Sequence, residues 1–196
     1  MCQLVLNTLK YFLPEKDFSW DELERITAKP RGKWTWPVAA MLWLVENGFE
    51  IKDIETFDYG RFVQEREKYL LETYGEEVAA AQIRNSDIEQ ERDLSAEFIK
   101  KISYSQSMPG ENDLKSLLEQ GFLCICAIDS GSLAGESEYS SHSVVLKGYT
   151  NDAFILHDPD VPPVENREVP FNKFEQAWAY PNAAAKNVLA VRMKQS

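Results

Sequence analysis

Two apolar segments that flank a turn, with an imidazole and a carboxylate at their outer ends, constrain the fold of this chain most strongly. Ser143 to Lys147 and Ala153 to Leu156 are the apolar segments, and Gly148, Asn151 and Asp152 lie between them. Glycine, asparagine and aspartate are typical turn residues, so the pattern predicts a β-hairpin.

The hairpin brings a histidine and an aspartate together. With residues 149–151 as a three-residue loop, Val144 lies opposite Leu156, and the same register places His142 opposite Asp158. Opposed residues have Cβ atoms roughly 4.5 to 5.5 Å apart, close enough for the carboxylate to orient the ring. The pair is either the base and its orienter in a catalytic triad or an ordinary structural ion pair at the end of a sheet.

The second histidine, His157, is next to Asp158 and therefore points to the opposite face of the sheet. The register above pairs it with Ser143. We interpret His157 as a structural or surface residue.

Charge and apolar content exclude several classes of function. The 196 residues carry a net charge of −11, with lysine and arginine scattered among carboxylates, which argues against nucleic acid or an anionic membrane as the main partner. No apolar run approaches the roughly 20 residues of a membrane-spanning helix, and the N-terminus has no signal-peptide pattern. We therefore expect a soluble, cytoplasmic protein. Cys2, Cys124 and Cys126 are odd in number, which predicts free thiols rather than a disulfide framework.

Helical patterns precede strand patterns along the chain. Helices are predicted for 4–12, for 20–26 after a capping Ser19, for 37–45, for 59–101 with breaks at Gly75 and 85–87, for a segment capped by Asn112 or Asp113, and for 171–178. Strands are predicted for 49–54, 122–128, the two hairpin arms, 167–169 and 188–193. The order predicts an α+β fold in which an N-terminal helical lobe, about 1–120, packs on a C-terminal antiparallel β-sheet lobe, about 121–196. We expect one domain over 1–196.

Cys2 is the cysteine placed most like a nucleophile. It lies where the first helix begins, and the N–H groups and dipole of a helix start favour a thiolate and supply donors for an oxyanion. Cys124 and Cys126 lie in an apolar strand, so we expect both to be inert core residues.

These residues together resemble the C39-like peptidases of the papain-like cysteine protease superfamily. The matching features are an N-terminal cysteine at a helix start, the segment from His142 to Tyr149, and the sequence His157-Asp158-Pro159. The resemblance covers most of the chain and implies a papain-like fold, with His142 as general base and Asp158 as its orienter. It also implies a cysteine nucleophile that leads the first helix and is followed by glycine, with an oxyanion glutamine a few residues upstream.

The chain departs from the family pattern around the nucleophile. Gln3 rather than glycine follows Cys2, no residue precedes Met1 to provide the glutamine, and the helix alignment places Cys2 about two positions inside the helix. Three interpretations follow: the reading frame starts further upstream, the protein is an inactive relative, or Cys2 serves with a shifted helix start. Gln3 is the oxyanion candidate if its side chain points back across the helix end.

The resemblance implies a thiol hydrolase that cleaves a peptide or amide bond and needs no cofactor. The alternatives are a catalytically silent module that binds a peptide or partner protein, and an acyltransferase or deamidase with the same triad. We expect a peptide or protein substrate, and the oligomeric state stays open. A metal site formed by His142, Asp158 and Asp160 is disfavoured, because the chain has two histidines and no clustered cysteines.

Overall fold

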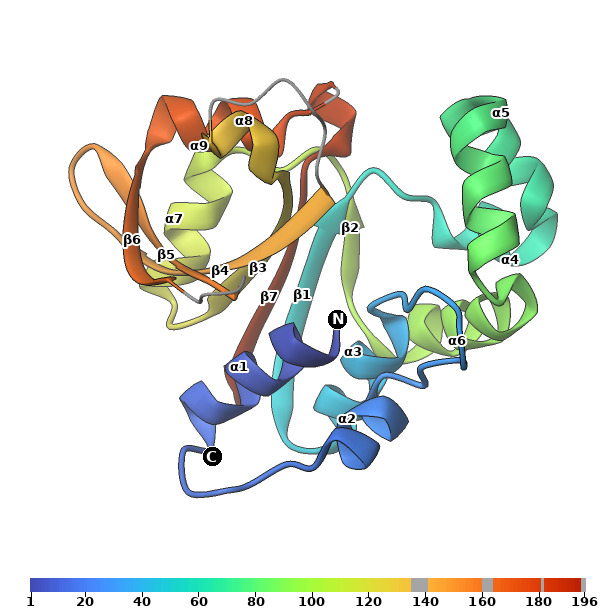
Figure 1. Cartoon of the computed structure of the whole chain (residues 1–196), viewed down its shortest axis with the longest axis horizontal. Coiled ribbons are helices and arrows are strands. Elements are labelled where there is room, and N and C mark those ends of the chain that lie inside the picture. The colour runs from blue at the N-terminus through green and yellow to red at the C-terminus, as the bar shows by residue number, and fades with distance from the viewer. Residues whose placement is uncertain (135–140, 160–163, 181, 195–196) are drawn as a thin grey trace.

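In the part of the chain that the structure describes, seven strands form a single, mostly antiparallel sheet that runs through the middle of the molecule (Figure 1). The computed structural model describes residues 1–134, 141–159, 164–180 and 182–194. The strands are β1 (Phe49–Glu55), β2 (Tyr104–Gln106), β3 (Leu123–Asp129), β4 (Ser141–Tyr149), β5 (Ala153–Asp158), β6 (Val164–Pro170) and β7 (Asn187–Met193), in the spatial order β2-β1-β7-β3-β4-β5-β6. Only the pair of β1 and β2 is parallel among the described strands.

Helices form most of the first 120 residues and cover both faces of the sheet. They are α1 (Cys2–Phe12), α2 (Trp20–Ile26), α3 (Val38–Glu46), α4 (Tyr59–Glu65), α5 (Glu67–Asn85), α6 (Ile88–Lys101), α7 (Glu111–Glu119), α8 (Ser130–Ala134) and α9 (Phe171–Trp178), with a 3₁₀ turn at Ala183–Ala185. Figure 1 shows α4 and α5 to one side of the sheet, next to α6. The predicted α+β fold, helices first and a mostly antiparallel sheet after them, is confirmed.

The core has two parts, one on each face of the sheet. Ile125 of β3 and Val145 of β4 belong to a cluster that includes apolar residues of α1 and α3. Cys124 and Val144, one position earlier on the same strands, belong to a second cluster with residues of α7 and α9. This alternation is the period of two that a strand buried on both faces requires.

The sheet also joins the early and late parts of the chain. Strand β1 lies in the first 120 residues, yet all seven of its residues pair with β7. We propose on this basis that 1–196 is one domain in which the helical lobe contributes two strands to the sheet.

Local signals explain where several helices begin or break. The side chain of Ser19 accepts a hydrogen bond from the N–H of Glu22 at the start of α2, as predicted. Gly75 has φ +79° and interrupts α5 at the predicted break. The helix α7 differs, because Gly110 is its N-cap and the carboxylate of Asp113 accepts the Gly110 N–H at 2.7 Å. The prediction of Asn112 or Asp113 as the cap was therefore wrong.

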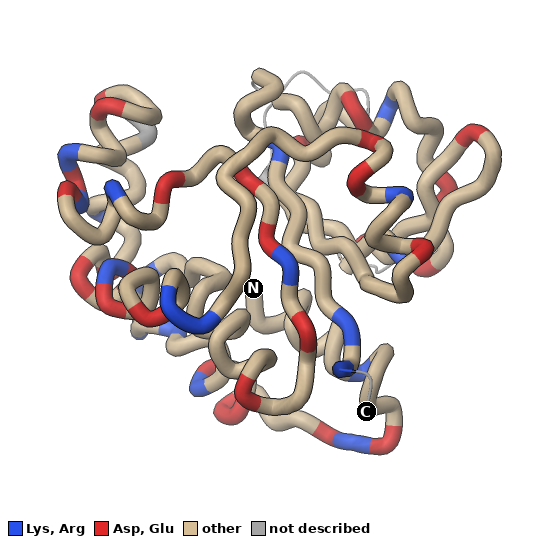
Figure 2. Tube along the Cα trace, turned by 180° about the vertical axis from the view of Figure 1, so that it is seen from behind, with Lys and Arg blue, Asp and Glu red and all other residues tan. Residues whose placement is uncertain are grey.

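Charged residues are interspersed over the chain. Figure 2 shows acidic and basic positions mixed along both the helices and the strands. Among the described residues, no helix has the length and apolar character needed to cross a membrane.

Candidate functional site

The predicted histidine and aspartate do meet at one end of the hairpin. His142, at the start of β4, donates from Nε2 to Oδ1 of Asp158, at the end of β5, over 2.7 Å. The two side chains are 20% and 9% exposed, so the pair is largely shielded from water. Because Nε2 holds the carboxylate, Nδ1 is the ring nitrogen left to accept a proton.

The register that produces this contact differs from the prediction. Val145 pairs with His157, and Leu146 pairs with Leu156, so the strands are shifted by two residues and the pairing of Val144 with Leu156 was wrong. A register irregularity between Leu146 and Gly148 accompanies the shift. His142 therefore reaches Asp158 diagonally rather than directly across, a separation that longer side chains can bridge.

Arg167 is a third member of the site that the sequence did not reveal. Its Nη1 donates to Oδ2 of Asp158 at 3.0 Å, so each carboxylate oxygen has a cationic or polar donor. Arg167 comes from β6, where it pairs with Leu156 of β5. The predicted strand 167–169 included this residue, but only the register of three strands brings its side chain to Asp158.

Cys2 lies at the first position of α1, as predicted, but its hydrogen-bond partner is Thr27, the residue that follows α2. The Sγ atom is 3.4 Å from Oγ1 of Thr27. Thr27 itself donates to the carbonyl of Leu23 at 2.9 Å, which leaves the Cys2 thiol as the donor in their contact. Among the described residues, no hydrogen bond joins Cys2 to His142.

The two candidate groups approach the sheet from different sides. Ile128, which pairs with His142, belongs to the cluster that α7 and α9 cover, whereas Cys2 packs against the cluster on the α1 face. The chain neighbours of the two groups nevertheless line one cavity, because Met1 and Ser143 are both among its walls. The start of α1 and the start of β4 therefore border the same space.

Gln3 does not point back over the start of the helix. Its Nε2 donates to Oδ1 of Asn7, one turn further along α1, at 3.0 Å. The condition under which Gln3 would act as oxyanion donor is not met in this conformation.

The remaining cysteines are core residues, as predicted. Cys124 and Cys126 are fully buried on β3 and point to the same side of the sheet. Burial raises the pKa of the Cys124 thiol to about 12 and raises that of Cys126 well above its usual value. Both are therefore protonated and unreactive at neutral pH.

His157 occupies the opposite face from His142, as expected for its neighbour on a strand. It pairs with Val145 rather than with Ser143, so the predicted partner was wrong. Its Nε2 lies 3.0 Å from Nδ2 of Asn7, which ties β5 to α1. Asp160, considered as a metal ligand, lies outside the described residues.

Comparison with known protein families finds one whose model matches this chain. The model of the Peptidase_C39 like family matches residues 61–186. The matched range contains His142, Asp158 and Arg167, and it begins after Cys2 and the first three helices. A search of the curated proteins finds no match.

Proposed function

The chain belongs to the Peptidase_C39 like family, and from this premise we propose that it is a cysteine peptidase-like hydrolase that cleaves a peptide or amide bond. The observation that carries the proposal is the 2.7 Å bond between His142 Nε2 and Asp158 Oδ1. That bond fixes the ring orientation and leaves Nδ1 available as a base. The substrate is a peptide or protein, and the three free thiols support a reducing, cytoplasmic location.

In the proposed reaction, His142 Nδ1 takes the proton of the Cys2 thiol, and the thiolate attacks the carbonyl carbon of the scissile bond. The imidazolium returns this proton to the leaving amine as the C–N bond breaks, and a thioester remains on Cys2. Water then hydrolyses the thioester, with His142 again acting as base. Asp158 stabilises the imidazolium throughout.

The oxyanion is assigned to the first free N–H groups of α1. A helix start presents such donors along with its positive dipole end. We leave the Gln3 side chain out of this assignment, since it is bonded to Asn7.

In the proposed reaction, the Cys2 thiol gives up its hydrogen bond to the Thr27 hydroxyl and contacts the ring of His142 instead. Ser143 and His142 are neighbours on β4 and point to opposite faces of the sheet, so His142 points away from the cavity that Met1 and Ser143 line, and the start of α1 must also move to bring the thiol to the ring. Thr27→Val would remove the acceptor that holds the thiol and should favour the productive arrangement.

Incubation with denatured casein, followed by mass spectrometry of the released peptides, tests hydrolysis directly. Wild type should release peptides, and Cys2→Ser and His142→Ala should each reduce the rate by at least about a hundredfold. His157→Ala is the matched control, because it removes the histidine of the opposite sheet face and should leave the rate unchanged. Equal rates in wild type and Cys2→Ser would overturn the proposal.

A second candidate is a non-catalytic module that binds a peptide or partner protein. The specific observation in its favour is the donation of the Cys2 thiol to Thr27, which leaves His142 without a nucleophile in this conformation. This function predicts no casein cleavage by any variant, including Thr27→Val, whereas the hydrolase predicts equal or faster cleavage by Thr27→Val than by wild type.

A further inference from the structure

Arg167 completes a series of three bonded side chains that come from three neighbouring strands. His142 of β4 bonds to Oδ1 of Asp158 on β5 over 2.7 Å, and Nη1 of Arg167 on β6 bonds to Oδ2 over 3.0 Å. Among the described residues, Asp158 is the only one to which Arg167 bonds. The guanidinium is therefore committed to the carboxylate that orients the base.

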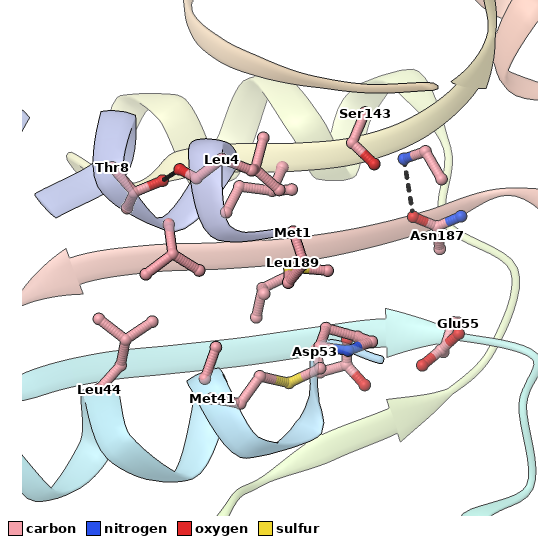
Figure 3. Close-up of a pocket in the computed structure, with 15 residues that line it drawn as sticks. Met1, Leu4, Thr8, Met41, Leu44, Asp53, Glu55, Ser143, Asn187 and Leu189 are labelled. Carbon is pink, nitrogen blue, oxygen red and sulfur yellow. Dashed lines mark hydrogen bonds between the residues drawn. The ribbon is translucent and has the colours of Figure 1, made fainter. Parts of the chain in front are cut away.

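The three side chains lie on the sheet face opposite the cavity beneath α1. Figure 3 shows Ser143 among the walls of that cavity. Successive residues of a strand point to opposite faces, so His142 lies on the other face, where its β3 partner Ile128 belongs to the cluster that α7 and α9 cover. Leu156, the partner of Arg167 on β5, belongs to the same cluster. Arg167 therefore lies on the same face as His142.

A bulge in β6 directs Arg167 at Asp158. Asp158 pairs with Val164, and Leu156 pairs with Arg167. One residue of β5 lies between these two pairs, whereas two residues of β6 do, which is the pattern of a β-bulge. Asn166, directly before Arg167, has φ +56°, a left-handed conformation that asparagine tolerates better than most residues. Bulges bend a strand and redirect a side chain, here that of Arg167.

The carboxylate of Asp158 needs two anchors to keep one orientation. The terminal torsion of an aspartate is broad, so a single bond to His142 would leave the carboxylate able to rotate. The bond from Arg167 fixes the second oxygen and with it the plane of the group. The strand pairing alone does not supply this restraint, because His142 reaches Asp158 diagonally.

Arg167 also balances the charge of Asp158 while His142 is neutral. The side chain of Asp158 is 9% exposed, and a carboxylate at this depth is costly without a cation. A neutral imidazole provides a donor but no charge. The guanidinium provides the charge, and its side chain is itself 35% exposed, so its own burial costs less.

We propose that Arg167 is a positioning residue, which holds the Asp158 carboxylate in the orientation in which Oδ1 fixes the ring of His142. Arg167 acts through Asp158 and not on the substrate. The inference rests on the proposed hydrolase, because that reaction is what uses the orientation of the ring.

The Nε2–H proton of His142 reports this positioning without any need for catalysis. In ¹H–¹⁵N NMR spectra of the full chain, wild type should show a hydrogen-bonded Nε2–H signal that His142→Ala removes. Arg167→Met keeps an unbranched side chain and removes every donor, so this proton should exchange with water at least about tenfold faster. Arg167→Lys keeps the charge without the planar fork and should restore part of the protection.

Arg192→Met is the matched control. Arg192 of β7 bonds to Glu50 of β1 over 2.6 Å, which is also an arginine–carboxylate pair between neighbouring strands of this sheet. This variant should leave the exchange of the His142 proton unchanged. If Arg167→Met does not fold, Arg167→Lys provides the test, because its exchange should still be faster than that of wild type.

Three results would overturn the positioning role. The first is equal exchange in wild type and the folded Arg167 variants, and the second is equal acceleration by Arg192→Met. The third is a wild-type spectrum without the Nε2–H signal of His142, since the bond that Arg167 supports would then not persist in solution.

Casein cleavage distinguishes a failure of this inference from a failure of the proposed function. In the hydrolase, Arg167→Met should lower kcat by at least about tenfold and leave KM nearly unchanged, because Arg167 does not contact the substrate. Faster proton exchange in Arg167→Met, with no cleavage by wild type, would overturn the hydrolase and support the positioning of His142. Unchanged exchange with normal cleavage would overturn the role of Arg167 alone.

Discussion

At the scale of single residues, Asp158 has the largest structural role in the site because it receives two donors at once. His142 and Arg167 bond to different oxygens of its buried carboxylate. The carboxylate therefore fixes the ring of His142 and is itself held in place by the guanidinium. Asp158 thus contributes both to stability and, in the proposed reaction, to the orientation of the base.

Replacement of Asp158 by alanine should lower the free energy of unfolding by about 1.5 to 3 kcal/mol, the range for hydrogen bonds that involve charged groups. Urea denaturation followed by circular dichroism measures this change. Asp17→Ala is the control, since the side chain of Asp17 is fully exposed and its ion pair with Lys10 should contribute nothing measurable. If Asp158→Ala lowered the free energy of unfolding no more than Asp17→Ala does, the structural role of Asp158 would be contradicted.

The three cysteines should differ sharply in reactivity. In the native protein at pH 8, iodoacetamide should modify Cys2 and leave Cys124 and Cys126 unmodified, because burial raises the pKa of both core thiols. In 8 M urea, all three should react. Peptide mapping by mass spectrometry reads the sites, and native labelling of Cys124 would show that β3 is not buried as described.

The residue-level site was only partly predictable from the sequence. The pairing of His142 with Asp158 followed from alternation along a hairpin, because a shift of two residues leaves every side chain on the same face. For the same reason, the apolar pattern could not distinguish the observed register from the predicted one. Arg167 and Thr27 lay beyond prediction, since each reaches its partner from a different element.

At the scale of elements, several helix boundaries were predictable from local residues, whereas the short strand β2 was not predictable. Ser19 and the break at 85–87 located the start of α2 and the boundary between α5 and α6 close to their observed positions, whereas the break at Arg66 between α4 and α5 was not predicted. Strand β2 has three residues and pairs in parallel with β1, so its sequence carries no alternation long enough to detect. The helix α8 is five residues long, and it is not among the helices predicted from the sequence.

The turn from α3 to β1 depends on a glycine. Gly48 has φ +87°, a conformation that costs other residues roughly 1 to 2 kcal/mol, and nothing lies within 4 Å of where its Cβ would be. Gly48→Ala should therefore destabilise the protein by about that amount through backbone strain alone.

Gly148→Ala is the matched control for this strain. Gly148 lacks a positive φ, and its added Cβ would meet Ile155 at an ordinary 3.9 Å, so stability should be unchanged or slightly raised. Urea denaturation of both variants compares them. Equal stability of the two variants would contradict the assignment of Gly48 to the left-handed conformation.

At the scale of the whole molecule, a buried carboxyl group makes stability depend on pH. Burial raises the pKa of Glu91 from 4.5 to about 7. Below pH 4.5 the Glu91 carboxyl is protonated in both the folded and the unfolded protein. Between pH 4.5 and 7 it is ionised in the unfolded chain but still protonated in the folded one. This group therefore stabilises the fold at low pH, and its contribution is lost as the pH rises to 7.

Glu91→Gln should remove this dependence. Because one pKa unit corresponds to about 1.4 kcal/mol, wild type should lose on the order of 3 kcal/mol more than the variant between pH 4.5 and pH 8. Urea denaturation at both pH values measures the difference, and the other carboxylates cancel in the comparison. Parallel pH profiles of wild type and variant would show that Glu91 is not buried in the folded state.

The overall architecture was easier to predict than its connections. Helical and alternating patterns indicated helices first and strands last, which defines the α+β fold. The pairing of β1 with β7 joins residues more than a hundred positions apart, and no local pattern records such a pairing. The position of α1 against the sheet likewise depends on contacts between distant parts of the chain. This position decides whether Cys2 can reach His142.

The rate of Cys2 alkylation in the native protein tests the proposed pairing of these two residues most directly. Iodoacetamide labelling near pH 6, quantified by mass spectrometry, compares wild type with His142→Ala and with His157→Ala as the control. The account predicts fast labelling that His142→Ala slows by at least about tenfold and that His157→Ala leaves unchanged. Slow labelling that is the same in all three proteins would contradict the hydrolase and leave the binding module as the function of this fold.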